Sequence, residues 1–294
     1  MTKTLYIIVG ATASGKTSLA IELAKHFHCE IVSADSRQIF KEMNIGVARP
    51  TLEELKAVRH HLIATWSINE EYNVARYEKE AINIIDTLFQ QNDYSVLVGG
   101  SGLYINAVIN GIDDMPDISK EVRSQVQQLY EEKGLAYLQN LLKEKDIEYY
   151  NIVDKQNHRR IQRALEIYFQ TGKTFTSFRT SNMAQRGFKI KIIGINRERQ
   201  DLINRINQRT DLMIKDGLVE EARELFDYRH LVALNTVGYK ELFDYFQNTI
   251  SLNEAIELIK VHTRQYAKRQ MTWFNKVPNI KWIDTTNEIN FDEL

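Results

Sequence analysis

Residues 10–17 read Gly10-Ala11-Thr12-Ala13-Ser14-Gly15-Lys16-Thr17, which has the spacing G-x-x-x-x-G-K-[ST] of a phosphate-binding loop. The run 5–9 before it is apolar and rich in β-branched residues, and apolar residues recur at helical spacing in 18–25 after it. A strand, a glycine-rich loop and a helix in this order are the context in which the motif binds phosphate.

All eight residues of 10–17 are therefore predicted to bind a diphosphate or triphosphate, through the loop N–H groups and the N-terminus of the following helix. Lys16 would supply a positive charge, and the Thr17 hydroxyl would bind Mg²⁺. The alternative is a chance match, against which the flanking strand and helix argue. The motif does not say which phosphate compound is bound.

The composition is that of an ordinary soluble globular protein, with 294 residues of which 43% are hydrophobic and 26% charged. No apolar run approaches the ~20 residues needed to span a bilayer. Cys29 is the only cysteine, which excludes internal disulfides and cysteine-based zinc sites. His60 and His61 are expected to cap or flank a strand rather than bind metal. Because the first strand begins within five residues of Met1, leaving no room for a leader peptide, we expect a cytoplasmic protein.

Positive charge is concentrated in two segments, although the formal net charge is only −1. The first, 155–163, has four cationic residues and no acid. The second, 258–283, has six cationic residues, no acid, and interleaved aromatic residues. Both favour a local contact with a polyanion, but two solvated helix faces explain them equally well.

Strands and helices alternate along most of the chain. Strands are predicted at 5–9, 30–34, 61–66, 94–98, 188–195 and 280–284. Helices are predicted at 73–90, 102–109, 119–131, 134–143, 157–171, 199–215, 217–227 and 252–275. The alternation indicates an α/β fold, a P-loop NTPase-like doubly wound parallel sheet. Residues 1–112 and 188–294 are predicted to form the P-loop catalytic core, and 113–187 a mostly helical insertion domain.

Asp35 follows the second predicted strand, with Ser33, Ser36 and Gln38 nearby. In an open parallel sheet, ligands bind beyond the carboxyl ends of the strands. A carboxylate there can hold Mg²⁺ or remove a proton from an acceptor. The alternative is an aspartate that only caps a turn or helix.

The strand ending at Val98 runs into Gly99-Gly100-Ser101-Gly102, without the acid that binds magnesium in nucleotide hydrolases. This absence argues against an ATPase motor. The glycines permit close backbone approach to a ligand, and Ser101 adds a hydroxyl. A flexible turn is the alternative.

Arg205, Arg209 and Met213 recur at i, i+4 and i+8 on one predicted helix. A cation there could neutralise charge on a departing phosphate group. Two exposed arginines in salt bridges explain the pattern equally well.

Six stretches together resemble the tRNA dimethylallyltransferase family, from the first strand to about Phe274. They are Gly10-Ala-Thr-Ala-Ser-Gly-Lys-Thr17, Asp35-Ser-Arg-Gln-Ile-Phe40, Gly99-Gly-Ser-Gly-Leu-Tyr104, Arg159-Arg-Ile-Gln-Arg-Ala-Leu-Glu166, Val237-Gly-Tyr-Lys-Glu241 and Thr263-Arg-Gln-Tyr-Ala-Lys-Arg-Gln-Met-Thr-Trp-Phe274. The glycine-rich loop alone is shared by many families, but the ordered set is specific.

The family moves a five-carbon allylic group from dimethylallyl diphosphate to N6 of the adenosine 3′ of the anticodon in certain tRNAs, releasing diphosphate. The resemblance implies that 10–17 binds the prenyl diphosphate, with Mg²⁺ on Thr17. It makes Asp35 the general base and gives Ser101 and Arg209 catalytic roles. It also implies contact with the tRNA anticodon stem-loop, partly from elements of the insertion, and a monomer without membrane attachment. The implied tRNA contacts are Asp35, Ser36, Arg37, Gln38, Ser101, Arg123, Arg159, Arg160, Ile161, Gln162 and Arg163.

Three positions depart from the family pattern. Ala11 stands where proline is usual, Ser101 where threonine is usual and Phe40 where tyrosine is usual. Ser101 keeps a hydroxyl, whereas Phe40 loses one, so any role of that hydroxyl does not carry over. The zinc finger of eukaryotic relatives is missing, since Cys29 stands alone.

Two other functions share these features. A P-loop small-molecule kinase would use Asp35 to activate an acceptor hydroxyl and would transfer phosphate from ATP. An RNA-binding protein with a nucleotide switch would show nucleotide-dependent RNA affinity without turnover. The glycine-ended strand at Val98 and the stretch 263–274 disfavour both.

Overall fold

The computed structural model describes residues 2–180, 184–284 and 289–294. The chain divides into two compact units. We call Met1–Asn110 with Gln185–Leu294 the core unit and Gly111–Ala184 the insertion unit. The insertion unit begins and ends a few residues before the range 113–187 expected from the sequence.

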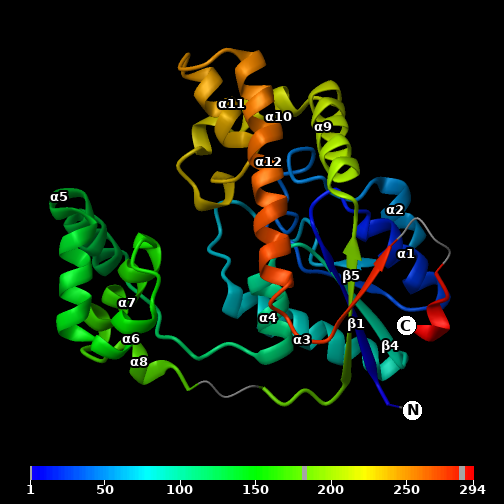
Figure 1. The fold of residues 1–294 in the computed structure, drawn as a ribbon, viewed down its shortest axis with the longest axis horizontal. Helices are drawn as coiled ribbons and strands as arrows, with labels where there is room; N and C mark the ends of the chain where they lie inside the picture. Colours follow the sequence, from blue (N-terminus) through cyan, green and yellow to red (C-terminus); the bar gives the residue numbers. More distant parts are fainter. Residues whose placement is uncertain (1, 181–183, 285–288) are drawn as a thin grey trace. The chain divides into compact units, whose positions relative to one another are not determined.

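The described residues of the core unit contain one six-stranded sheet, in which every pair of neighbouring strands is parallel and the order is β3-β2-β4-β1-β5-β6 (Figure 1). The strands are β1 (Thr4–Gly10), β2 (Ile31–Ser33), β3 (His60–His61), β4 (Tyr94–Val98), β5 (Lys189–Asn196) and β6 (Ile280–Asp284). Because parallel strands end at the same edge, the segments that follow β1, β2 and β4 come together. The predicted α/β fold with a parallel sheet is confirmed.

Helices pack on both faces of this sheet and, beyond the carboxyl ends of its strands, on one another (Figure 1). They are α1 (Lys16–His26), α2 (Leu52–Ala57), α3 (Val74–Gln91), α4 (Gly102–Asn110), α9 (Arg199–Lys215), α10 (Leu218–Glu224), α11 (Tyr239–Phe246) and α12 (Leu252–Phe274), with the short 3₁₀ helices η1 (Phe226–Tyr228), η2 (Val232–Leu234) and η3 (Phe291–Glu293). None of the helices in the described part of the chain is long and apolar enough to cross a membrane.

Strand β1 is buried on both faces, because alternate side chains enter different cores. Leu5, Ile7 and Val9 pack in a cluster with residues of α3, α4, α10, α11 and α12. Tyr6 and Ile8 pack in a second cluster with residues of α1. The continuous apolar run at 5–9 is the pattern of a central parallel strand.

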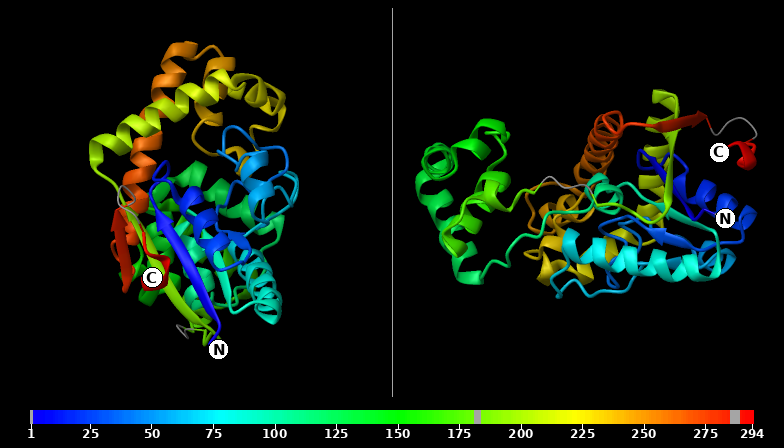
Figure 2. Two further views of the ribbon diagram at one scale, coloured as in Figure 1. Left: turned by 90° about the vertical axis from the view of Figure 1, so that its right-hand side faces the viewer. Right: turned by 90° about the horizontal axis from the view of Figure 1, so that it is seen from below.

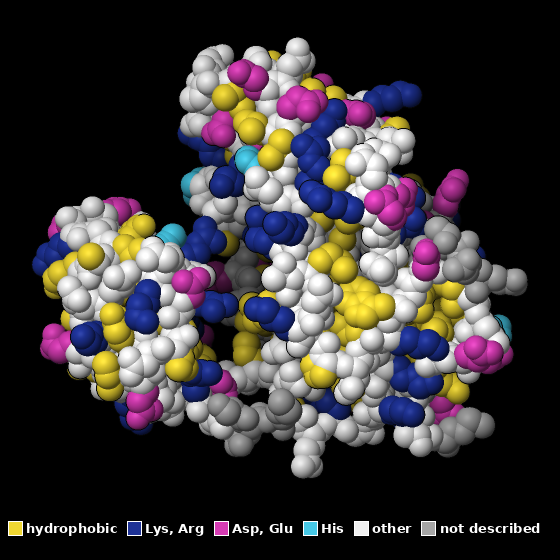
Figure 3. Space-filling view, viewed as in Figure 1, with side chains coloured by type: hydrophobic (Ala, Val, Ile, Leu, Met, Phe, Trp, Pro, Cys, Tyr) yellow, Lys and Arg dark blue, Asp and Glu magenta, His cyan; other side chains and the backbone are white. Residues whose placement is uncertain are grey.

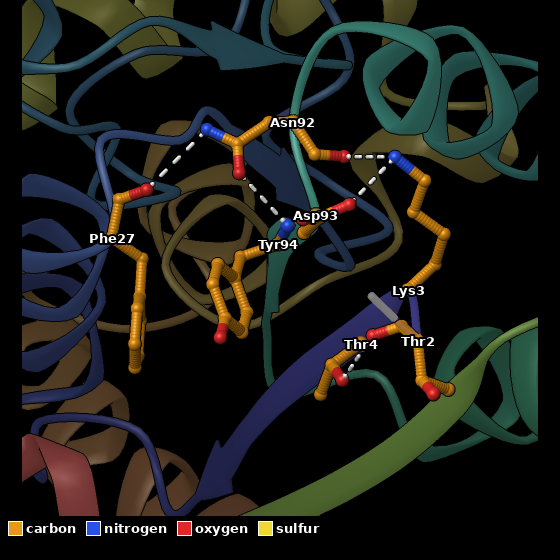
Figure 4. Close-up of polar contacts among 7 residues, drawn as sticks. All are labelled: Thr2, Lys3, Thr4, Phe27, Asn92, Asp93 and Tyr94. Carbon is orange, nitrogen blue, oxygen red and sulfur yellow. Dashed lines mark hydrogen bonds and ion pairs between the residues drawn. The ribbon is translucent and has the colours of Figure 1, made fainter.

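Polar contacts at the start of β1 and β4 fix the register of these two strands (Figure 4). Lys3 Nζ lies 2.9 Å from Asp93 Oδ1 and donates to the Asn92 carbonyl oxygen at 3.1 Å. Asn92 also accepts from the Tyr94 N–H at 2.9 Å and donates to the Phe27 carbonyl oxygen at 3.4 Å. These contacts lie at the end of the strands opposite the glycine-rich loop.

The C-terminal segment packs on α1. In η3, Asp292 Oδ1 lies 2.9 Å from His26 Nε2. The ring centroids of Phe291 and His26 lie 5.4 Å apart. The three views agree on this placement of the C-terminus beside α1 (Figures 1 and 2).

The predicted strand at 61–66 is wrong beyond its first residue. Strand β3 contains only His60 and His61, so the two histidines form an edge strand rather than flank one. Leu62 and Ala64 follow with φ of 60° and 51°. This left-handed backbone cannot continue a ladder, and only an isolated bridge between Trp66 and Phe40 remains.

The described part of the insertion unit consists of helices and connecting loops: α5 (Lys120–Lys145), α6 (Ile147–Ile152), α7 (His158–Thr171) and α8 (Phe175–Phe178). The two helices predicted at 119–131 and 134–143 are both present: the stretch labelled α5 consists of two helices that meet at Gly134, where φ is 75° and ψ is 178°, a non-helical conformation. The unit has its own core, formed by Val126, Leu138, Leu142, Val153, Ile161, Ala164 and Leu165.

Candidate functional site

The glycine-rich loop turns sharply from β1 into α1. Gly15 precedes α1 with φ of 100°, a conformation that glycine adopts without strain. Ala13 has φ of 63°, which is uncommon for a residue with a Cβ and requires support from its surroundings.

Three arginines from the segment β5–α9 bind this loop at successive positions. Arg209 Nη2 donates to Thr12 Oγ1 at 2.6 Å. Arg205 Nε donates to the carbonyl oxygen of Ala13 at 2.8 Å, and Arg197 Nε donates to the next carbonyl oxygen along the loop at 2.7 Å. Arg205 and Arg209 are half-buried and bind the loop, so they are not merely a pair of exposed arginines in salt bridges. Sequence reasoning selected Arg205 and Arg209 by helical spacing and missed Arg197.

Lys16 lies against the loop, with its Nζ 2.6 Å from the carbonyl oxygen of Ala11. Burial and the nearby positive charge of Arg209 lower the pKa of Lys16 to about 8, although the charge of Asp35 opposes this shift. The protein groups around Lys16 therefore compensate its ammonium charge poorly. An anionic ligand would stabilise its charged form.

Gln270 of α12 joins the glycine-rich loop to the loop after β4. Its Oε1 accepts from the Thr12 N–H at 2.8 Å, and its Nε2 donates to the Gly100 carbonyl oxygen at 3.0 Å. Gln270 is only 6% exposed, so both ends of its amide are satisfied inside the protein. The residue lies in the stretch 263–274, but nothing in the sequence assigned it this role.

The glycines after β4 let protein segments approach one another, an effect that sequence reasoning attributed to a ligand. A Cβ on Gly99 would lie 2.2 Å from the Ala34 carbonyl oxygen, and one on Gly100 would lie 2.2 Å from Gln270 Nε2. This is tight packing rather than a flexible turn. Both glycines also line the cavity described below.

Asp35 caps the turn after β2. Its Oδ1 accepts from the N–H groups of Arg37 and Gln38 at 2.8 and 3.2 Å. The Ser36 N–H donates to Ser101 Oγ at 2.9 Å, and the two serine hydroxyls lie 3.1 Å apart. No described residue is hydrogen-bonded to Asp35 Oδ2. Asp35 therefore caps the turn through Oδ1 alone.

Two cavities meet at Asp35. The phosphate cavity, of about 430 Å³, is lined by the glycine-rich loop, Lys16, Thr17, the glycines after β4 and Arg205. The second cavity, of about 380 Å³, is lined by residues of the Asp35 turn, η2–α11 and α12. The residues that line both are Thr12, Asp35, Val47, Ala48 and Arg209.

The basic segment 258–283 divides into two kinds of cation. Lys260 lies 2.8 Å from Asp211, and Arg264 donates to Asn207 at 2.7 Å, so both tie α12 to α9. Lys268 and Arg269 are exposed. Figure 3 shows Lys and Arg side chains gathered over the part of the core unit where α12 and α9 lie. Charge alone suggested either contact with a polyanion or a solvated helix face, and neither explanation accounts for the whole segment.

The remaining predicted tRNA contacts lie in the insertion unit. Arg159 and Arg160 are exposed on α7, whereas Arg163 lies 3.5 Å from Glu166. Ile161 is fully buried in the core of the unit. The other two residues are Gln162 of α7, which donates to Gln127 at 2.9 Å, and Arg123 of α5. The contact of these insertion-unit residues with tRNA stays a prediction. Because Ile161 is buried, it can support such a contact only by holding α7 in place.

A glycine-rich loop at the carboxyl edge of an all-parallel sheet, with a carboxylate beside it, defines an α/β protein of the P-loop class. The chain belongs to the family described as IPP transferase, whose profile matches residues 38–277. The resemblance drawn from the sequence motifs is therefore confirmed. The matched range begins after 10–17 and Asp35, but alignments with individual relatives span nearly the whole chain.

The chain is 50% identical to the tRNA dimethylallyltransferase of Christiangramia forsetii over 284 residues, which cover 97% of this chain and 94% of the relative. Among solved structures, it is similar to the tRNA isopentenylpyrophosphate transferase of Bacillus halodurans, with a TM-score of 0.69, 35% identity, and coverage of 99% and 92%. It is also similar to a eukaryotic dimethylallyltransferase acting on tRNA, with a TM-score of 0.80, 26% identity, and coverage of 96% and 74%.

Proposed function

We propose that this protein transfers a dimethylallyl group from dimethylallyl diphosphate to N6 of the adenosine 3′ of the anticodon in tRNA, and releases diphosphate. The observation that carries the proposal is the position of Asp35 on the boundary shared by the phosphate cavity and the second cavity. A donor bound on one side and an acceptor base bound on the other would meet beside a carboxylate. The names of the related proteins describe this kind of transfer.

The donor's diphosphate fits the phosphate cavity. Lys16, Arg205 and Arg209 line it and bring positive charge to the place where the departing oxygen becomes negative. The N-terminus of α1 adds its partial positive charge. These groups lower the barrier to breaking the bond between the allylic carbon and the diphosphate oxygen.

A magnesium ion fits the oxygen donors of this cavity. Thr17 and Asp35 both line it, and the hydroxyl of Thr17 would hold the ion. The described residues hold no group of three or more His, Cys, Asp or Glu placed to bind a metal, so other ligands would come from diphosphate and water. When bound, the ion would neutralise charge on the diphosphate.

The acceptor nitrogen needs help because the lone pair of an exocyclic adenine amine is delocalised into the ring. Asp35 Oδ2, which no described residue binds, would take one N6 proton as the new N–C bond forms. The C–O bond of the donor breaks, and its electron pair leaves with the diphosphate. Turn N–H groups hold Oδ1, so the free oxygen is presented in a fixed direction.

The second cavity suits a base removed from an RNA loop. Tyr266 and Arg269 line it and lie near each other, with 5.8 Å from the guanidinium carbon to the ring centroid. Aromatic rings and arginine planes stack on unpaired bases, and a loop base leaves its stack more easily than a duplex base. Water must be excluded when the allylic cation character develops, which a base filling this cavity would achieve.

The rest of the anticodon stem-loop would contact the exposed arginines of α7 and the serine turn at Asp35. Phosphate contacts of this kind give affinity that falls with salt. The protein is proposed to act in the cytoplasm as a monomer.

The test is incubation of the protein with anticodon stem-loop RNA, magnesium and dimethylallyl diphosphate labelled in its carbon chain. Label should move to RNA that has adenosine 3′ of the anticodon, and not to a matched RNA with guanosine at that position. Label on neither RNA would refute the transfer. Phosphate transfer from labelled ATP to a small acceptor, without RNA, would instead identify a kinase.

A further inference from the structure

The loop between the Asp35 turn and α2 contributes to the boundary between the two cavities. Val47 and Ala48 of this loop line both cavities. Ala48 has φ of 49°, and its N–H donates to the Ile45 carbonyl oxygen at 2.9 Å. A non-glycine residue keeps a left-handed conformation only where neighbouring groups hold it.

Glu221 of α10 holds one side of this loop. Its Oε2 accepts from the N–H groups of Asn44 and Ile45 at 3.1 and 2.8 Å, and its Oε1 accepts from the Gly46 N–H at 2.9 Å. Three successive backbone donors converge on one carboxylate. This arrangement fixes the direction in which the chain leaves toward Val47.

Tyr239 of α11 makes a further contact with the Glu221 carboxylate. Its hydroxyl donates to Glu221 Oε1 at 2.6 Å, and its side chain is fully buried. Burial and the Glu221 charge raise the pKa of Tyr239, so the hydroxyl keeps its proton. A Cβ on Gly46 would lie 2.6 Å from the Tyr239 ring, which makes the tyrosine a close-fitting support for the loop.

Gln38 connects the other side of the loop to Asp35. Its Nε2 donates to the carbonyl oxygens of Val47 and Ala48 at 3.2 and 2.8 Å. Its own N–H donates to Asp35 Oδ1 at 3.2 Å. Hydrogen bonds, joined through the backbone of residues 46–48, therefore connect Tyr239 to the proposed base.

We propose that Glu221 and Tyr239 are positioning residues for the transfer reaction: they hold the 44–48 loop, and through Gln38 they orient Asp35 at the boundary of the two cavities. This proposal rests on the proposed function. It also gives a role to Tyr239 in the stretch 237–241, which the mechanism otherwise leaves unused. Neither residue lines the phosphate cavity or the second cavity, so neither is expected to touch substrate.

The test compares Tyr239→Phe and Glu221→Gln with Glu224→Gln, an exposed glutamate on the same helix. Tyr239→Phe keeps the ring against Gly46 and removes only the hydroxyl, so it should fold. We expect kcat for prenyl transfer to fall about tenfold in Tyr239→Phe and at least tenfold in Glu221→Gln. The affinity for inorganic diphosphate should stay within about twofold, because neither residue lines the phosphate cavity. Glu224→Gln should match the wild type.

The double variant separates positioning from general loss of structure. If the two residues act as one unit, the variant that combines Tyr239→Phe and Glu221→Gln should have a kcat within about twofold of that of Glu221→Gln alone. If they act independently, its kcat should fall by the product of the two single effects. Equal loss of kcat and diphosphate affinity, or an unchanged kcat in Tyr239→Phe, would overturn the proposal. If Glu221→Gln does not fold, Tyr239→Phe alone decides. A wild-type protein without prenyl transfer would refute the proposed function instead.

Discussion

Replacing Asp35 by asparagine separates its role as the cap of the turn from its proposed role as the general base. An asparagine keeps an oxygen that can accept from the Arg37 and Gln38 N–H groups, so the turn after β2 should be retained. Only the ability to take a proton is lost. General-base catalysis typically contributes 10²–10⁴-fold, so we expect the transfer rate to fall at least ~100-fold, which corresponds to about 2.7 kcal/mol of barrier.

The assay is single-turnover transfer of labelled prenyl group to anticodon stem-loop RNA, near pH 7. The pH matters because the Asp35 charge raises the pKa of Lys16. Without that charge, the Lys16 pKa would fall below about 8, and at alkaline pH the loss of donor binding would be mistaken for loss of a base. Diphosphate affinity near pH 7 should change only modestly.

Two further variants make the Asp35 experiment decisive. Asp35→Ala also loses both turn hydrogen bonds, so it should be at least as slow as Asp35→Asn, and the difference measures the structural role. Asp216→Asn, an exposed aspartate at the end of α9, should behave as the wild type. A rate for Asp35→Asn within about threefold of the wild type would show that Asp35 is not the base.

Three other predictions concern the loop and the RNA. Because Lys16 has a pKa of about 8 and binds an anion only when protonated, the affinity for inorganic diphosphate should fall as pH rises above about 8, by up to ~10-fold per unit, in calorimetric titrations. Neutralising Arg160 and Arg163 should weaken stem-loop RNA binding and reduce the slope of log affinity against log salt by about one to two. Gln270→Leu leaves a loop N–H and a buried carbonyl unpaired, so it should lower the free energy of unfolding by about 2–4 kcal/mol and weaken diphosphate binding.

Each of these three predictions has a matched control. Lys16→Met should lose the fall in affinity above pH 8, and Lys25→Met, at an exposed position of α1, should keep it. Lys173 is exposed in the insertion unit, so Lys173→Gln should leave the slope of log affinity against log salt unchanged. If the arginine variants also leave this slope unchanged, the basic face of α7 is only exposed to solvent and does not bind RNA. Gln265→Leu, exposed on α12, should not lower stability; equal unfolding curves for both glutamine variants would contradict the role of Gln270.

Much of the fold was predictable because it depends on local patterns. The apolar runs at 5–9 and 94–98 are central strands, and the spacing of 10–17 identified the glycine-rich loop. Spacing along a helix also selected Arg205 and Arg209. The prediction failed at 61–66, because the apolar pattern there does not reveal that Leu62 and Ala64 adopt a left-handed backbone that ends the ladder.

The amino-acid sequence by itself determined the class of fold, the phosphate-binding loop and the acid beside it, since each depends on residues close together in the chain. Only the tertiary structure decided how the glycine-rich loop and the 44–48 loop beside that acid are held. Gln270 reaches the loop from 258 residues away, and Glu221 reaches the backbone of Gly46 from 175 residues away. Hydrogen bonds between such distant segments depend on where α10 and α12 pack against the core, and no spacing in the sequence encodes that position.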